Sequence, residues 1–142
     1  MTFSELIQSQ EELLQRLLLV SQRQVEIVDR GDPTILVMFL EQRERLWDEF
    51  ELLEQQIHPH KGIPPEKRVW ESAEERQRTE LALNRSNKLL QDIMTNDQIS
   101  FTRAVELKDK VEKDLRRVQV AKTAAPAYMR QSRINSNELG DD

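Results

Sequence analysis

The chain has 142 residues, of which 33% are charged and 37% hydrophobic, and its formal net charge is −5. This length suits one domain, and a composition richer in charged residues than that of average soluble domains favours long, solvated helices over a large compact core. The acidic balance argues against nucleic-acid binding, which relies on basic surfaces, and the absence of cysteine excludes disulfides and thiolate metal sites.

The N-terminal residues contain no stretch apolar enough for a signal peptide or a membrane span. The longest uninterrupted apolar run in residues 1–20 covers only residues 17–20. A secretory core needs roughly 7–15 apolar residues, and a membrane-spanning helix needs ~20. We therefore expect a cytoplasmic protein without membrane insertion.

Two helices joined by a tight turn are expected over residues 4–30 and 33–57, because apolar residues recur there at intervals of three and four. Gly31 accepts the left-handed conformation that is common after a helix end. Asp32 is placed to cap the second helix, and Pro33 suits its first turn. Helices connected this closely lie antiparallel.

A loop is predicted over residues 58–71, which contain three of the five prolines. Its two histidines, His58 and His60, are interpreted as solvated residues, because a metal site needs three or four ligands. Trp70 is expected to anchor this loop, as Trp47 and Phe50 are expected to lie in the core.

A third, overlong helix is predicted over residues 72–122. Ser72 and Glu75 have the spacing of a capping box, and no glycine or proline follows until Pro126. Several residues of its apolar stripe repeat every seven positions, as in a coiled coil. The stripe is predicted to consist of Leu83, Leu90, Ile93, Met94, Phe101, Ala104, Val111, Leu115 and Val118.

The weakest part of the third helix is the sequence Thr95-Asn96-Asp97, which combines three poor helix formers. Asp97 also falls within the apolar stripe. This pattern allows two structures: a straight helix with a polar position in its stripe, or a hinge that turns the rest of the helix back.

The predicted third helix is about twice as long as either of the first two, so a straight one leaves half of its stripe without a partner in the chain. Exposed apolar surface of that extent usually marks a binding site. A partner's amphipathic helix is the favoured occupant, and self-association or internal burial through a hinge are the alternatives. The candidate binding residues are Ala104, Leu107, Val111, Leu115 and Val118.

Residues 123–142 lack helical periodicity and are expected to form a flexible tail. The tail places Tyr128, Met129 and Ile134 among the basic residues Arg130 and Arg133. Because tyrosine and arginine are frequent interface anchors, we interpret these residues as a second contact with another protein. A tail without any role is the alternative.

No catalytic, cofactor-binding or metal-binding residue is predicted. The many carboxylates lie on exposed helix faces, whereas catalysis requires groups held in a shielded cleft. The sequence has no glycine-rich phosphate loop and no serine or cysteine nucleophile in a recognisable setting. We therefore do not expect an enzyme.

The chain resembles flagellar export chaperones of the hook-associated-protein type, the FlgN-like family. The resemblance rests on the first helix ending in EIVDRGD, the second helix LVMFLEQRERLWDEFELLEQQI, the proline-rich loop, the long charged third helix and the aromatic in the tail. It implies a cytoplasmic protein that binds the C-terminal helical part of hook–filament junction proteins and delivers them to the type III export gate. It also implies that the client packs on the C-terminal helical region and that Tyr128 contacts the gate.

Together these observations predict an all-α, elongated antiparallel three-helix bundle or coiled coil. Its helical domain covers residues 1–122, with an overlong third helix, and a flexible tail covers residues 123–142. The predicted function is an export chaperone for hook-associated flagellar proteins. The alternative is a homodimeric coiled-coil scaffold with no role in export.

Overall fold

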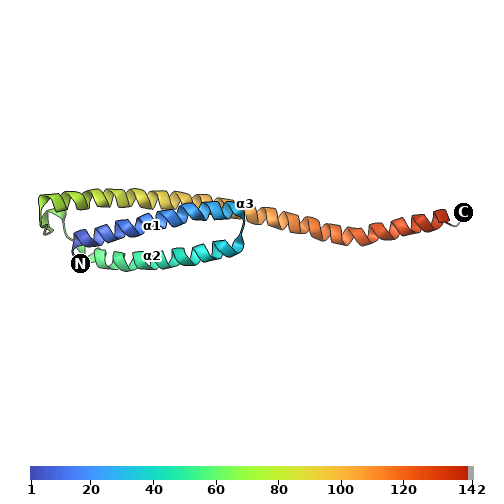
Figure 1. Ribbon diagram of the computed structural model, residues 1–142, viewed down its shortest axis with the longest axis horizontal. Helices are drawn as coiled ribbons and strands as arrows, with labels where there is room; N and C mark the ends of the chain where they lie inside the picture. The colour runs from blue at the N-terminus through green and yellow to red at the C-terminus, as the bar shows by residue number, and fades with distance from the viewer. Residues whose placement is uncertain (141–142) are drawn as a thin grey trace. The chain divides into compact units, whose positions relative to one another are not determined.

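The computed structural model describes the backbone of residues 1–140 and the side chains of residues 1–124. The described residues form three α-helices, a short 3₁₀ helix and no strand, as an all-α chain should (Figure 1). The chain divides into two compact units, Met1–Arg103 and Ala104–Asp142. The first unit contains helices α1, Phe3–Arg30, and α2, Pro33–Lys61, together with the first part of α3, Ala73–Gly140.

The predicted hairpin of α1 and α2 is confirmed, with the expected residues at its turn. Gly31 has φ 69° and ψ 25°, and its amide donates to the carbonyls of Ile27 and Val28. The carboxylate of Asp32 accepts hydrogen bonds from the amides of Thr34 and Ile35 at 3.0 and 3.2 Å. These caps satisfy backbone groups that helix ends otherwise leave unpaired.

Helix α2 is longer than the sequence predicts, because it includes residues 58–61 of the expected loop. Pro59 lies in its last turn, where a missing amide costs a single helical hydrogen bond. The connection to α3 therefore begins at Gly62 and contains the 3₁₀ helix η1, Pro65–Lys67.

Helix α3 begins where its predicted capping box places it. The Ser72 hydroxyl accepts from the Glu75 amide at 3.1 Å, and the Glu75 carboxylate accepts from the amide of Glu71 at 2.9 Å. The structure continues the α3 backbone to Gly140, whereas the sequence predicts a helix end near residue 122. Ala124 and Ala125 are strong helix formers, so Pro126 alone opposes helix there. The flexibility expected of residues 123–142 stays a prediction.

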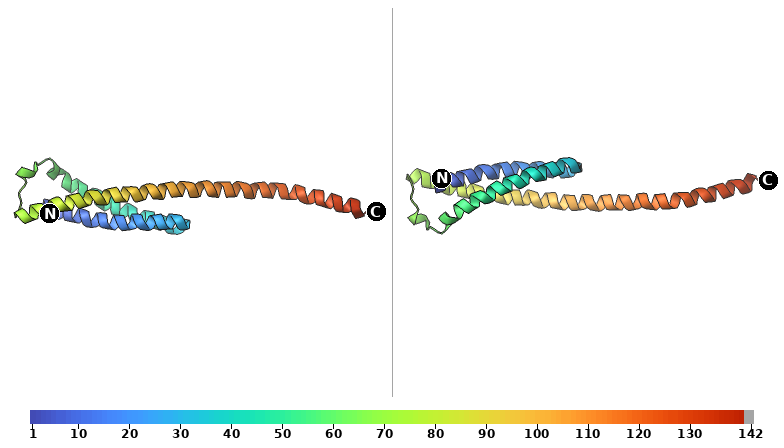
Figure 2. Two further views of the ribbon diagram at one scale, coloured as in Figure 1. Left: turned by 90° about the horizontal axis from the view of Figure 1, so that it is seen from above. Right: turned by 90° about the horizontal axis from the view of Figure 1, so that it is seen from below.

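Within the unit Met1–Arg103, α3 runs parallel to α1 and antiparallel to α2 (Figures 1 and 2). Side-chain hydrogen bonds join α1 to α3 in four pairs of residues. In each pair the two residues are separated by 74 or 75 positions in the chain. A constant separation shows that the two helices keep one register along their contact. The pairs are Ser4–Thr79, Glu11–Arg85, Ser21–Asn96 and Asp29–Arg103. The hydrogen bond with Glu11 raises the pKa of the Arg85 guanidinium.

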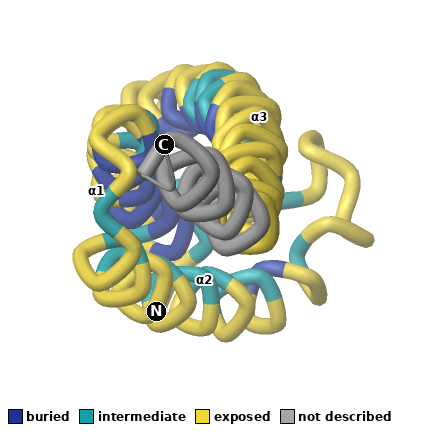
Figure 3. Tube along the Cα trace, turned by 90° about the vertical axis from the view of Figure 1, so that its right-hand side faces the viewer, coloured by how far each residue is buried: buried dark blue, intermediate teal, exposed yellow. Residues whose placement is uncertain are grey.

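The core of this unit consists of two clusters of aliphatic side chains between the helices. Leu6, Ile7, Ile57 and Ala82 form the cluster nearer the η1 loop. Leu14, Leu17 and Ile93 form the second cluster, and Trp47 and Phe50 pack against it, as predicted for these aromatics. The two aromatic rings contact each other edge to face, with their centroids 5.2 Å apart. Figure 3 shows the buried residues of α1 turned toward the other two helices.

The buried face of α3 agrees with the predicted stripe at Leu83, Leu90 and Ile93, which lie in or against the core, and differs at two other positions. Met94 and Phe101 are 68% and 72% exposed, so their assignment to the inner stripe is wrong. The buried residues repeat every seven positions at Thr79, Ser86, Ile93 and Ser100. Three of the four, Thr79, Ser86 and Ser100, are small and polar, so a search for apolar residues misses the repeat.

Helix α3 is continuous through residues 95–97, and no hinge occurs there. Asp97 is paired through both carboxylate oxygens with the guanidinium of Arg43 on α2. Arg43 also donates to Gln24 of α1 at 2.9 Å. The polar position in the stripe is therefore a three-helix contact, and a paired carboxylate needs no break in the helix.

Candidate functional site

The candidate binding residues of α3 lie on one face of the unit Ala104–Asp142. Leu107, Val111, Leu115 and Val118 are 38%, 48%, 56% and 50% exposed, and Ala104 is half-buried. Their spacing of three and four residues places them in a row along the helix. We call this row the 104–118 face.

The chemistry of the 104–118 face suits a protein helix as its ligand. Its groups are aliphatic side chains of leucine, valine and alanine, which offer no donor, acceptor or nucleophile. Each large side chain that becomes buried contributes roughly 1.5–3 kcal/mol. A row of such residues at helical spacing is complementary to the apolar face of another amphipathic helix.

The tail residues Tyr128, Met129 and Ile134 lie outside the described side chains. Whether they contact another protein stays a prediction. The described side chains of the candidate site are therefore those of the 104–118 face.

A second exposed apolar surface, which sequence reasoning missed, surrounds the start of α2. Residues 35–40 are six consecutive apolar residues, so they cover every side of the helix. Leu36 and Phe39 are half-buried in the bundle, whereas Ile35, Val37, Met38 and Leu40 are exposed. A helix that is apolar on all sides usually has partners on all sides, and an unbroken apolar run is the signal that could have revealed this surface.

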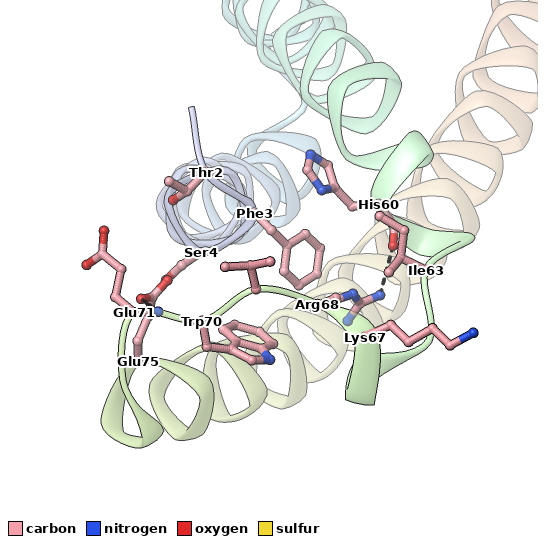
Figure 4. A pocket seen from close by; sticks show the side chains of 11 residues that line it. Thr2, Phe3, Ser4, His60, Ile63, Lys67, Arg68, Trp70, Glu71 and Glu75 are labelled. Carbon is pink, nitrogen blue, oxygen red and sulfur yellow. Dashed lines mark hydrogen bonds between the residues drawn. The ribbon is translucent and has the colours of Figure 1, made fainter.

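A cavity of about 470 Å³ lies where the N-terminus of α1 meets the loop before α3 (Figure 4). The Arg68 guanidinium lies over the Phe3 ring at 4.3 Å and donates to the His60 carbonyl at 3.1 Å. Trp70 packs edge to face against the same ring at 6.0 Å. These contacts hold the loop against α1, which confirms the anchoring role predicted for Trp70.

Several groups around this cavity make structural contacts. The Glu75 carboxylate caps α3, and the His60 ring stacks near Phe3 at 5.5 Å. Arg68 Nε and Trp70 Nε1 are buried donors without a partner in the structure. The cavity is lined by groups from the loop and from the ends of α1, α2 and α3.

Among the residues that the structure describes, no group of three or more histidine, cysteine or acidic side chains is placed to hold a metal ion. No described helix combines the length and the apolar character needed to cross a membrane. No protein-family model, curated protein or solved structure matches this chain.

Proposed function

We propose that this protein is an export chaperone that covers an amphipathic helix of its client with the 104–118 face. The observation that carries the proposal is the exposure of four large aliphatic side chains in one row of α3. Monomeric proteins rarely leave such a row uncovered. A client helix seated there has its own apolar face shielded, which prevents it from assembling prematurely.

The finer identity of the client follows from the sequence resemblance. We propose that the clients are hook-associated flagellar proteins, bound through their C-terminal helical part in the cytoplasm and delivered to the flagellar type III export gate. The hairpin with its Gly31-Asp32-Pro33 turn and the long charged α3 are features of that resemblance. The proposed mechanism involves no catalytic step and no cofactor.

The energetics of the 104–118 face are consistent with reversible capture. Burial of two or three large apolar side chains on each partner, at roughly 1.5–3 kcal/mol apiece, offsets an association cost of roughly 4–15 kcal/mol. Because the gain and the cost are of similar size, binding at this face is expected to be reversible. Reversible binding suits a chaperone, which must release its client at the gate.

The test is a calorimetric titration of the full chain with the C-terminal segment of a hook–filament junction protein from the same organism. Leu115→Asp places a charge in the 104–118 face and is expected to weaken binding tenfold or more, as a loss of roughly 1.5–3 kcal/mol implies. Val120→Asp is the matched control, because Val120 is an exposed apolar residue on the opposite side of α3. Equal binding by both variants would show that the client does not use this face.

The tail is proposed to act in a second step, contact with the export gate, which can be tested separately from client binding. We expect Tyr128→Ala to leave client binding unchanged and to block export, measured as secretion of the client from cells that carry the variant. Normal secretion by that variant would remove Tyr128 from the proposed contact with the gate.

A further inference from the structure

The charges beside the 104–118 face are almost all of one sign. In a heptad register with Ala104, Val111 and Val118 at position a, the flanking e and g positions between residues 104 and 122 are residues 108, 110, 115, 117 and 122. Four of the five are basic, one is Leu115, and none is acidic. The basic flank residues are Lys108, Lys110, Arg117 and Lys122.

None of the acidic residues between residues 104 and 122 occupies an e or g position, although the Glu112 carboxylate lies 3.9 Å from Lys108 Nζ. Glu106, Asp109 and Glu112 occupy positions c, f and b, which face outward from the seam of a coiled coil. The bundle has the opposite balance, since residues 1–103 contain 13 basic and 19 acidic residues. The flanks of the 104–118 face are therefore basic within a chain that is acidic overall.

This pattern disfavours a second copy of the chain as the occupant. In a parallel pair, Arg117 of one copy would face Lys122 of the other, and Lys110 would face Leu115. In an antiparallel pair, e positions face e positions and g positions face g positions, so basic residues again meet. No acidic residue is available at these positions in either arrangement, and the like charges select against self-association.

The pattern also disfavours an anionic membrane surface, which basic amphipathic helices often bind. Asp114 lies at a d position, inside the apolar row, and it is exposed. A carboxylate there would enter the lipid interface with the leucine and valine side chains. A protein helix, in contrast, can place a basic side chain opposite it.

The bundle provides an internal example of that arrangement. Asp97 lies at an a position of the same register, and Arg43 of α2 pairs with both of its carboxylate oxygens. A partner helix on the 104–118 face would satisfy Asp114 in the same way, with a lysine or arginine in its own seam. Such a polar pair also fixes the register of the two helices.

The g positions indicate how many helices cover the face. Within the bundle, where α3 contacts both α1 and α2, the g positions Glu75 and Ala82 are buried and Leu89 and Asn96 are half-buried. The g position is already basic and exposed at Arg103, which pairs with Asp29 of α1. It is again basic and exposed at Lys110 and Arg117. The apolar face is therefore narrower than the face buried by two neighbours, and its width suits one helix.

We infer that the 104–118 face takes a single amphipathic helix of another protein, with acidic residues along its flanks and one basic residue in its apolar seam. This inference rests on the proposed function and specifies the chemistry of the client. The Glu or Asp residues of the partner pair with the basic flank residues, while its apolar residues meet Leu107, Val111 and Val118.

The test uses two synthetic helical peptides of about three heptads with the same apolar seam and one seam lysine. One carries glutamate at every e and g position and the other carries lysine. Calorimetric titration of the full chain is expected to give at least tenfold tighter binding of the glutamate peptide at low salt. The difference should shrink in about 1 M salt, where the screening length is ~3 Å.

Charge-reversal variants connect this preference to the named residues. Lys110→Glu with Arg117→Glu changes two flanking positions and is expected to shift the preference toward the lysine peptide. The matched control is Lys113→Glu with Arg116→Glu, which changes the net charge equally at the outward positions c and f. The control should retain the preference for the glutamate peptide.

The outcomes separate this inference from the proposed function. Equal binding of both peptides, or tighter binding of the lysine peptide, overturns the inferred client chemistry and leaves a helix-binding face. Binding of neither peptide by a monomer overturns both the inference and capture at this face. A stable dimer that excludes both peptides, or binding to anionic phosphatidylserine vesicles in preference to the glutamate peptide, overturns the inference in favour of those occupants.

Discussion

The contact between Arg43 and Asp97 shows how a residue that looks misplaced in the sequence becomes part of the fold. Asp97 interrupts an apolar stripe, and its poor helix propensity raises the alternative of a hinge. In the structure the Arg43 guanidinium meets its carboxylate, and the Gln24 amide oxygen and the Trp47 ring also contact Arg43. No local pattern reveals this partner, because the two residues are 54 positions apart.

At this scale we predict that Asp97 and Arg43 are energetically coupled. Asp97→Leu alone leaves a partly buried guanidinium unpaired and is expected to lower the free energy of unfolding by about 1–3 kcal/mol. Adding Arg43→Met should restore much of that loss, because two apolar side chains can replace a paired charge. Urea denaturation of the two single variants and the double variant measures the coupling. Strictly additive effects would mean that the pair contributes no interaction of its own.

At the scale of the helices, the sequence predicts which helices form and that the first two pair. It predicts less well where a helix ends and which of its residues are buried. The Gly31-Asp32-Pro33 turn and the Ser72–Glu75 capping box use local chemistry, and both occur as predicted. The end of α2 is misplaced because Pro59 is accommodated in a last turn. Met94 and Phe101 are wrongly assigned to the buried face of α3. The buried residues Thr79, Ser86 and Ser100 are missed, because they are polar and a search for apolar periodicity passes over them.

The corrected face of α3 predicts that mutations at two adjacent residues change the stability by very different amounts. Ile93 is buried in the second core cluster, so Ile93→Ala should lower the free energy of unfolding by about 2–5 kcal/mol. Met94 is exposed, so Met94→Ala should change it by no more than about 0.5 kcal/mol. Thermal and urea unfolding of both variants measures these changes. A large loss for Met94→Ala would restore the face predicted from the sequence.

At the scale of the whole chain, the sequence predicts the all-α class and the three helices because periodicity and caps are local signals. It also singles out Leu107, Val111, Leu115 and Val118, which the structure leaves exposed. Apolar periodicity alone does not identify the partner, because an exposed apolar row indicates a binding surface without indicating what binds there. The basic flank residues narrow our proposal for the partner, because their like charges disfavour a second copy of the chain.

The central claim is that the 104–118 face is open in the free chain and becomes covered by one client helix. The chain has no cysteine, so Val111→Cys gives a unique site for a polarity-sensitive fluorescent label, and Val120→Cys gives the control on the opposite side. We predict that a hook–filament junction segment shifts the Val111 label to shorter wavelength, saturating at one client per chain, and leaves the Val120 label unchanged. A Val111 label that stays solvent-exposed at saturating client, or is already shielded in a dimer of the chain alone, would contradict the account.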